Sequence, residues 1–351
     1  MLERIEKTCQ TLHSACSRLS RQINIMEVCG THTVAIFRSG IRSLLPDNLR
    51  LLSGPGCPVC VTDQSYIDTL LQIAQRTDVL IATYGDMMRV PGSTGSMESL
   101  PNVHVVLSAD DALMLAQKNP DKIVVFAAVG FETTAPATAV VVQDAAREGI
   151  DNFCILCGHK RVIPAMKTLV ADRNDKIDAF LCPGHVSVIL GSDAYIPIAQ
   201  VFCRPCVAAG FEPMQILEGL AAICRQKVEG KASVESVYGA VVTPQGNKTA
   251  QQLLADVFEF SDDPWRGLGV IKDGSFKLRK AFKQFDAAER FAIEQIPAPE
   301  AGACRCGQVL CGLIDPPQCP LFGRRCTPDA PVGPCMVSTE GACAAWYKYG
   351  Q

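Results

Sequence analysis

The stretch from Cys304 to Cys343 holds the densest group of potentially reactive side chains in the 351-residue chain. It has no apolar periodicity that could build a core, so it needs disulfides, zinc or an iron–sulfur cluster to hold it together. Its seven cysteines, set among Pro and Gly, are Cys304, Cys306, Cys311, Cys319, Cys326, Cys335 and Cys343. Zinc ligand pairs usually have about two to four residues between them, whereas the close pair here, Cys304 and Cys306, has one. Wide gaps favour a cubane cluster held by four thiolates, although spacing alone does not select four ligands from seven.

A second pair, Cys57 and Cys60, stands in Gly54-Pro-Gly-Cys-Pro-Val-Cys60, between an expected strand and an expected helix. A helix N-terminus lowers the pKa of a thiol through its dipole and free N–H groups. Two cysteines at this spacing can form a reversible disulfide, as in thioredoxin-like proteins. The alternatives are metal ligation, which needs a second pair, and inert packing. The pattern favours a redox or ligand role.

Cysteine and histidine stand three residues apart in two further turns, at Cys29/His32 and at Cys182/His185. A thiolate and an imidazole in such a turn could hold a soft metal. A buried cysteine beside a satisfied histidine would give the same pattern, so either turn alone is weak evidence. Their repetition, together with a C-x-x-C turn, indicates function.

Glu132 follows another expected strand, in Gly130-Phe-Glu-Thr-Thr134. Its carboxylate could serve a site. The stretch could equally be a helix N-cap, because Thr and Glu are common at helix starts for that reason. No G-x-x-x-x-G-K-[ST] or G-x-G-x-x-G motif is present, so the sequence predicts no nucleotide site of those kinds.

These turns share one position, since each follows the carboxyl end of an apolar run. Continuous apolar strands alternating with helical patterns are typical of parallel sheets covered on both faces. Ligands bind at the carboxyl ends of the strands in such folds. The expected strands are 50–53, 78–83, 103–107, 123–129, 153–156, 179–181, 206–209 and 237–242, with a helix at 249–260.

The expected fold class is therefore α/β, with two doubly wound parallel-sheet domains and a C-terminal cysteine-rich iron–sulfur domain. A cleft between the two α/β domains is the expected site. The expected divisions are an N-terminal helical segment with the Cys29 loop (1–45), a first α/β domain with Cys57 and Cys60 (46–120), a second α/β domain (121–240), and a helical and cluster domain (241–351).

The composition narrows the function classes. A formal net charge of −3 argues against nucleic acid or an anionic membrane as the main partner. No run of about 20 apolar residues occurs, and the N-terminus alternates charged and apolar residues, which predicts an amphipathic helix and a cytoplasmic protein.

Because the cytoplasm keeps thiols reduced, the 18 cysteines favour metal-binding or redox roles over structural disulfides. Cys9, Cys16 and Cys224 lie in helical patterns and are expected to have no functional role. Two further C-x-x-C pairs, Cys154/Cys157 and Cys203/Cys206, are expected to be buried core residues.

Together these motifs resemble the HypD family of hydrogenase maturation factors. The matching segments are Glu27-Val-Cys-Gly-Thr-His32, Gly54–Cys60, Cys182-Pro-Gly-His-Val-Ser187 and the cysteine-rich tail, in the same order over nearly the whole chain. The tail contains the family's cluster pattern C-x₁₄-C-x₆-C-x₁₆-C. The resemblance implies that the ligands of a [4Fe-4S] cluster are Cys304, Cys319, Cys326 and Cys343.

The resemblance also implies a scaffold that assembles the Fe(CN)₂CO group of [NiFe] hydrogenases with a small chaperone, HypC, and with cyanide from HypE. Cys29 would hold the iron together with a cysteine of HypC, and His32 would be a ligand or lie beside it. Cys57 and Cys60 would form a redox dithiol that exchanges electrons with the cluster, as in ferredoxin–thioredoxin reductase. The remaining candidate site residues are Cys182, His185 and Glu132.

Two other interpretations stay open. The chain could be a thiol–disulfide reductase that uses a cluster to reduce Cys57–Cys60 and then acts on a protein substrate. Such an enzyme has no use for Cys29 beside His32. The chain could also be a zinc-binding interaction protein without redox activity, which iron and sulfide analysis would distinguish.

Overall fold

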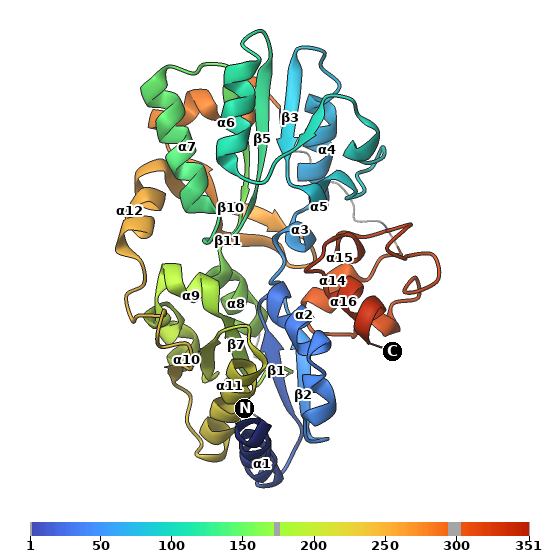
Figure 1. Ribbon diagram of the computed structural model, residues 1–351, viewed down its shortest axis with the longest axis vertical. Helices are drawn as coiled ribbons and strands as arrows, with labels where there is room; N and C mark the ends of the chain where they lie inside the picture. The colour runs from blue at the N-terminus through green and yellow to red at the C-terminus, as the bar shows by residue number, and fades with distance from the viewer. Residues whose placement is uncertain (1, 172–175, 294–302, 351) are drawn as a thin grey trace.

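Two parallel β-sheets form the frame of the molecule, with a two-stranded antiparallel hairpin between them (Figure 1). The computed structural model describes residues 2–171, 176–293 and 303–350. The first sheet has the order β2 (Leu49–Ser53), β1 (Ile23–Glu27), β7 (Ala179–Pro183), β8 (Cys206–Ala209), β9 (Val234–Ser236). The second has the order β4 (Val103–Val105), β3 (Val79–Thr83), β5 (Ile123–Gly130), β6 (Phe153–His159). The hairpin joins β10 (Phe258–Trp265) to β11 (Gly269–Leu278).

Helices connect these strands and cover the sheets. They are α1 (Leu2–Ser17), α2 (Gly30–Arg38), α3 (Pro58–Val61), α4 (Gln64–Ile73), α5 (Gly85–Met88), α6 (Ala109–Lys118), α7 (Ala135–Glu148), α8 (Val162–Ala171), α9 (Gly184–Leu190), α10 (Ile196–Phe202), α11 (Pro213–Val228), α12 (Lys248–Val257), α13 (Ala287–Arg290), α14 (Cys306–Leu310), α15 (Pro334–Val337) and α16 (Ala342–Tyr349). Short 3₁₀ helices are η1 (Ile41–Leu44), η2 (Met97–Ser99), η3 (Ser192–Tyr195), η4 (Lys280–Phe285) and η5 (Pro316–Gln318). Within the described ranges, no helix has the length and apolar character needed to cross a membrane.

Both faces of each parallel sheet are buried, because successive side chains of a strand point to opposite faces. In β1, Ile25 belongs to an outer core with α1, α2 and α11, whereas Met26 belongs to an inner core. In β5, Phe126 packs with α6 and α7 on the outer face, and Val125 lies in the inner core. The expected α/β class with parallel sheets is confirmed.

The inner core joins the two sheets to the C-terminal segment, residues 303–350. It contains Phe180 from the first sheet, Leu156 from the second, and Leu310 and Met336 from the C-terminal segment. Burying a large apolar side chain contributes about 1.5–3 kcal/mol. The three parts of the chain therefore stabilise one another through this core.

Strand pairing does not follow the expected divisions of the chain. The chain leaves the first sheet after β2, builds the second sheet and returns to the first at β7. Blocks 46–120 and 121–240 therefore each contribute strands to both sheets, and β1 within 1–45 is a strand of the first sheet. Apolar runs predict strands, but they carry no information about pairing when a connection can be long.

The region after α12 also differs from the expectation. The helix expected at 249–260 ends at Val257, and Phe258 begins β10. Phe258 and Phe276, on the paired strand, pack into the outer core of the second sheet, so tertiary contacts select strand over helix. The strand expected at 237–242 lies earlier, as β9.

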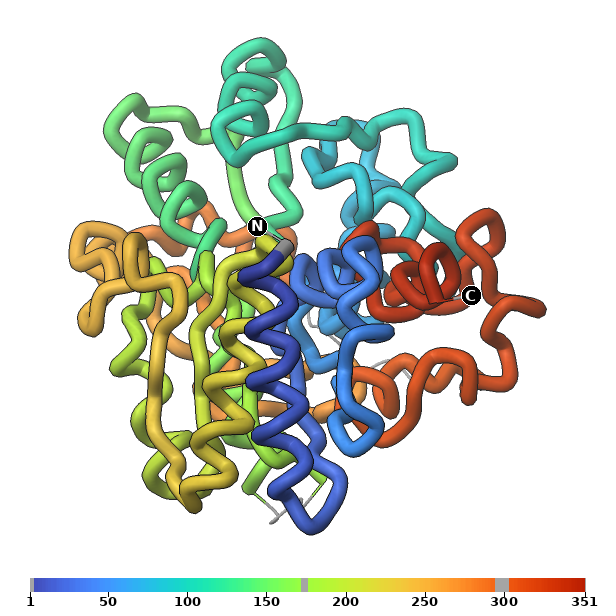
Figure 2. Tube along the Cα trace, turned by 60° about the horizontal axis from the view of Figure 1, so that its bottom comes forward, coloured from blue at the N-terminus to red at the C-terminus, as the bar shows by residue number. Residues whose placement is uncertain are grey.

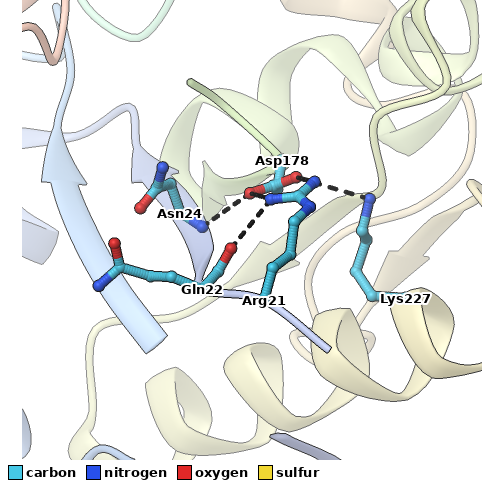
Figure 3. A network of polar contacts seen from close by, with 5 residues as sticks. All are labelled: Arg21, Gln22, Asn24, Asp178 and Lys227. Carbon is cyan, nitrogen blue, oxygen red and sulfur yellow. Dashed lines mark hydrogen bonds and ion pairs between the residues drawn. The ribbon is translucent and has the colours of Figure 1, made fainter. Parts of the chain in front are cut away.

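A buried carboxylate fastens the amino edge of the first sheet (Figure 3). Asp178, just before β7, forms an ion pair with Arg21, and its Oδ1 lies 3.8 Å from Nζ of Lys227 on α11. Its Oδ2 accepts from the amide of Asn24 at 2.9 Å. Arg21 also donates to the carbonyl of Gln22 at 2.9 Å. These contacts join the ends of α1 and α11 to β1 and β7, opposite the edge that carries the candidate site.

Candidate functional site

The loops after β1 and β2 meet at the carboxyl edge of the first sheet. The two strands are paired neighbours, so the turns at Cys29 and Cys57 leave the sheet side by side. The amide of Gly30 donates to the carbonyl of Gly56 at 3.2 Å. A Cβ atom at Gly56 would collide with backbone atoms of Cys29, so only glycine permits this approach. The structure thus brings Cys29 and the C-x-x-C turn together.

Cys57 and Cys60 form a disulfide across the first turn of α3, with Cα atoms 5.2 Å apart. Cys57 is the N-cap, and Pro58 follows at the first helical position, where its missing N–H costs no hydrogen bond. The amide of Cys60 donates to the sulfur of Cys57 at 3.2 Å. Helix α3 packs against both β5 and α15. The disulfide therefore lies where the two sheets and the C-terminal segment meet.

The thiol of Cys29 is buried at the N-cap of α2. Burial raises the pKa of Cys29 to about 12, while the amide of His32 acts in the opposite direction. A helix N-terminus alone lowers a cysteine pKa, so burial outweighs the helix at this position. The thiol is protonated at neutral pH and would release its proton on binding a metal cation.

The imidazoles of His32 and His185 lie against the ring of Phe211, at centroid distances of 4.8 Å and 5.1 Å. Nε2 of His32 donates to the carbonyl of Gly210 at 2.9 Å, which assigns the proton to that nitrogen. Nδ1 of His32 is buried without a partner among the described residues. Burial lowers the pKa of both histidines to about 4. Both rings are neutral at pH 7, the form that can ligate a metal.

Cys182 lies inside the inner core, on β7. Its thiol contacts that of Cys206 on β8, and burial raises the pKa of Cys182 far above its ordinary value. Of the pair expected in the core, Cys206 is buried, whereas Cys203 is exposed because it lies in the turn between α10 and β8. His185 instead packs on Phe211. The two members of the Cys182/His185 pattern therefore have different neighbours.

Six cysteines of the C-terminal segment line one cavity with Val309, Leu321, Phe322, Gly333 and Met336. They include the four of the expected cluster pattern and are Cys304, Cys306, Cys319, Cys326, Cys335 and Cys343. Burial, Cys343 and Cys319 raise the pKa of Cys326. The pKa of Cys304 is raised mainly by Cys306 and by burial, with a smaller contribution from Cys343. The four pattern thiols therefore lie close enough to interact.

The donors of this cavity suit an iron–sulfur cluster. In the part of the chain that the structure describes, no three His, Cys, Asp or Glu side chains converge as ligands of a single metal ion. A cubane differs, because each iron takes one thiolate and the four sulfurs surround the cluster without meeting. The cavity measures about 20 Å³, so its thiols would separate around a cluster.

Polar contacts hold the C-terminal segment against the sheet edge, where it lies beside α2 (Figures 1 and 2). Oδ2 of Asp86 accepts from the hydroxyl of Ser338 at 2.9 Å and from the amide of Thr339 at 3.0 Å. The hydroxyl of Thr31 donates to Oε1 of Glu340 at 2.6 Å. A Cβ atom at Gly30 would also collide with Glu340. The segment thus covers the first turn of α2, directly after Cys29.

Comparison of the sequence with known proteins identifies the family. The family model HypD, described as the Hydrogenase formation hypA family, matches residues 3–350. The chain belongs to the HypD family. It is 46% identical to the hydrogenase maturation factor HypD of Escherichia coli (strain K12), over 99% of this chain and 96% of that protein. It is also 46% identical to HypD of Azotobacter vinelandii, over 94% and 90%, and 45% identical to the hydrogenase expression/formation protein HupD of Azotobacter chroococcum, over 95% and 90%.

Membership of the HypD family assigns the chain a role in hydrogenase maturation. Glu132, a further candidate, follows β5 in this HypD-family protein and is 2% exposed. Its Oε1 accepts from the amide of Val162 at 3.0 Å, and its Oε2 has no partner among the described residues. Burial raises the pKa of Glu132 to about 7. Glu132 is therefore not the N-cap of α7, which is Thr134; its carboxyl group instead accepts from the first amide of α8.

Two features of this HypD-family structure have no signal in the sequence. The amide of Arg266 donates to the carbonyl of Val61 at 2.9 Å, and its guanidinium donates to that of Thr62 at 3.0 Å, which fastens the end of α3. The sulfurs of Cys306 and Cys335 lie 2.6 Å apart. Nothing in the local pattern marks Arg266 or pairs these two cysteines, because both contacts join distant parts of the chain.

Proposed function

We propose that this HypD-family protein is the scaffold on which the Fe(CN)₂CO group of [NiFe] hydrogenase is assembled, with Cys29 holding the iron. The observation that carries the proposal is the direct backbone contact between Cys29 and the turn of the Cys57–Cys60 disulfide. A thiolate is a soft ligand suited to Fe(II) that carries cyanide and CO. It can also pass iron to another thiolate by exchange, as a transfer scaffold requires.

The neighbouring side chains have distinct roles in this proposal. Nδ1 of His32 offers a free lone pair, either as an iron ligand or as the acceptor of the Cys29 proton. The Cys57–Cys60 disulfide takes up two electrons and two protons to give two thiols. The four thiols proposed to hold a [4Fe-4S] cluster, which supplies single electrons, are Cys304, Cys319, Cys326 and Cys343.

Partners complete the proposed assembly. A HypC-type chaperone contributes a second thiolate to the iron, and a HypE-type protein delivers cyanide. Cys29 is 2% exposed, and Glu340 packs on Gly30 next to it. A partner thiol therefore reaches the iron only when the cover over the first turn of α2 is displaced. Docking should be modest in area and reversible, since the chaperone must leave with the cargo.

A second candidate function is a thiol–disulfide oxidoreductase acting on a protein substrate. The disulfide on α3, in contact with α15 of the cysteine-rich segment, favours it. The two functions differ in their need for Cys29. A reductase would keep its disulfide reductase activity in Cys29→Ala, whereas a scaffold would lose its cargo.

Infrared spectroscopy of the protein, purified anaerobically with its HypC-type partner, tests the proposal. Bands of iron-bound cyanide and CO should be present in the wild type and absent in Cys29→Ala. Cys154→Ala is the matched control, because Cys154 is also a buried thiol but lies on β6. Bands that persist in Cys29→Ala would contradict the anchor. Analysis should give about four irons and four sulfides per chain; zinc without sulfide would exclude the cluster.

A further inference from the structure

A separate cavity of about 380 Å³ lies beside α12. Helix α12 and the C-terminal segment lie on opposite sides of the molecule (Figures 1 and 2). The loops after β5 and β6, the end of α9, α12 and the hairpin enclose the cavity. Cavities that bind small molecules measure about 300–1,000 Å³, so this one is large enough for a small ligand. No described cysteine lines it, which separates it from the sulfur chemistry of the candidate site.

The walls of this cavity are largely apolar. The apolar side chains that line it are Leu190, Leu254, Ala255, Phe258, Phe260 and Phe276, and Gln251 and Glu259 line it as well. Phe260 is 54% exposed. An exposed aromatic ring beside a cavity is typical of a surface that a ligand covers. The walls favour a ligand with an apolar or aromatic body.

Two guanidinium groups, of Arg161 and Arg279, also line the cavity. Each is held by one hydrogen bond to a carbonyl, from Arg161 to Asp273 and from Arg279 to Ala255, both at 2.6 Å. Arg161 is further fixed over the ring of Phe260, 3.4 Å from its centroid.

Neither guanidinium forms an ion pair with a described carboxylate, although Glu132 and Asp273 lie near enough to Arg161 to favour its charged form. Glu259, which also lines the cavity, is paired with Lys277. Both arginines therefore keep N–H groups for an anion. Arginine held in this way is suited to carboxylate and phosphate groups.

Glu132 forms part of the inner wall of the cavity, and its carboxyl group is a second, independent indication of a ligand. Its buried Oε2 has no hydrogen bond among the described residues. Buried polar atoms are nearly always satisfied by the protein, by water or by a ligand. Burial raises the pKa of Glu132 to about 7, so near neutral pH a protonated carboxyl group is available to donate to an oxygen of the ligand.

We propose that this cavity binds a small organic anion, with a carboxylate or phosphate group on Arg161 and Arg279 and an apolar body against the phenylalanines. In this proposal the cavity neither holds iron nor accepts cyanide. The proposed anion site is therefore independent of the proposed scaffold function. Glu132 closes its inner end.

Ligand-observed NMR on the full-length protein tests this site with four probes: phenylacetate, phenyl phosphate, benzylamine and inorganic phosphate. The two aromatic anions should bind and benzylamine should not. Whichever aromatic anion binds more tightly identifies the ligand group as carboxylate or phosphate. Arg279→Gln should weaken their binding at least tenfold. Lys280→Gln is the matched control, because it removes the same charge from an exposed neighbour outside the cavity.

A second variant separates binding from folding. Phe260→Ser changes a half-exposed side chain and should weaken both aromatic anions more than inorganic phosphate, because it removes the apolar wall as well as the ring under Arg161. Thermal unfolding verifies that each variant is folded. Absence of anion binding to the wild type, equal binding of benzylamine, or unchanged binding in folded Arg279→Gln would each overturn the proposal.

Discussion

The edge of the first sheet and the C-terminal segment both carry clustered sulfur, but they are built differently. Cys29 and Cys57 follow two paired strands, and a glycine contact sets their separation. The C-terminal segment consists of short helices and loops, and it is positioned by contacts such as those of Asp86 and Glu340. The backbone of the sheet positions the turns at its edge. The C-terminal segment is positioned by contacts with neighbouring elements and by the thiols around its cavity.

This difference suits the two regions to different tasks. A sheet edge holds its turns in place without a ligand. The proposed iron anchor and dithiol need such a preformed position, because the iron is bound and later released. A segment that gathers six thiols around one cavity gains most from a bound metal cofactor, because coordination deprotonates the thiols and becomes part of the folding free energy. The comparison predicts that the two regions respond separately to substitution.

The largest effect is expected from Cys29→Ala. Hydrogenase maturation in cells should fall to background, because the proposed iron anchor is lost, while the purified protein keeps its iron–sulfur absorbance. Hydrogenase activity and the visible spectrum are the two measurements. Loss of that absorbance in Cys29→Ala would show that the two regions are not independent.

Substitution of the proposed cluster ligands should have the next largest effect. Replacing any one of the four by Ala should remove most of the iron and the visible absorbance, and should increase hydrogen exchange in the C-terminal segment but not in α2 and α3. Cys311→Ala is the control, because Cys311 lies in the same segment but does not line the cavity. Full iron content in Cys319→Ala would reject the ligand assignment.

Gly56→Ala tests the contact at the sheet edge. The added methyl group has to displace the backbone at Cys29, and overpacking of this kind costs about 1–3 kcal/mol. Chemical denaturation should show this loss, and maturation should decrease as the two turns separate. Gly239→Ala should change stability by less than about 0.5 kcal/mol, because a Cβ atom there meets no other atom within 4 Å.

The smallest effect is expected from Asp86→Ala. It removes the acceptor of the hydrogen bonds from Ser338 and Thr339, at about 1 kcal/mol or less for each half-exposed bond. Hydrogen exchange should rise around residues 338–340 and stay constant in the C-x-x-C turn. Equal increases in hydrogen exchange around residues 338–340 and in the C-x-x-C turn would mean that the sheet edge depends on the C-terminal segment for its stability.

Much of this site was predictable from the sequence. Strand–turn–helix patterns placed Cys57 and Glu132 after strands, where the structure has them. They placed Cys29 in a turn after a short apolar run, which the structure shows to be the strand β1. The burial of Cys206 was also predictable, from its apolar strand. The Cys306–Cys335 contact and the role of Arg266 were not, because they join distant segments whose local patterns are ordinary. The Cys29 pKa is a further example, since helix position predicts a low value and burial produces a high one.

The sequence by itself determined the α/β class, the family and the positions of the reactive residues, because side-chain periodicity and motif spacing are local properties of the chain. Tertiary structure decided which strands pair, that β1 and β7 belong to one sheet although the second sheet lies between them in the chain, and what lies beside each thiol. Strand pairing and burial depend on contacts between distant residues. A linear pattern does not contain them.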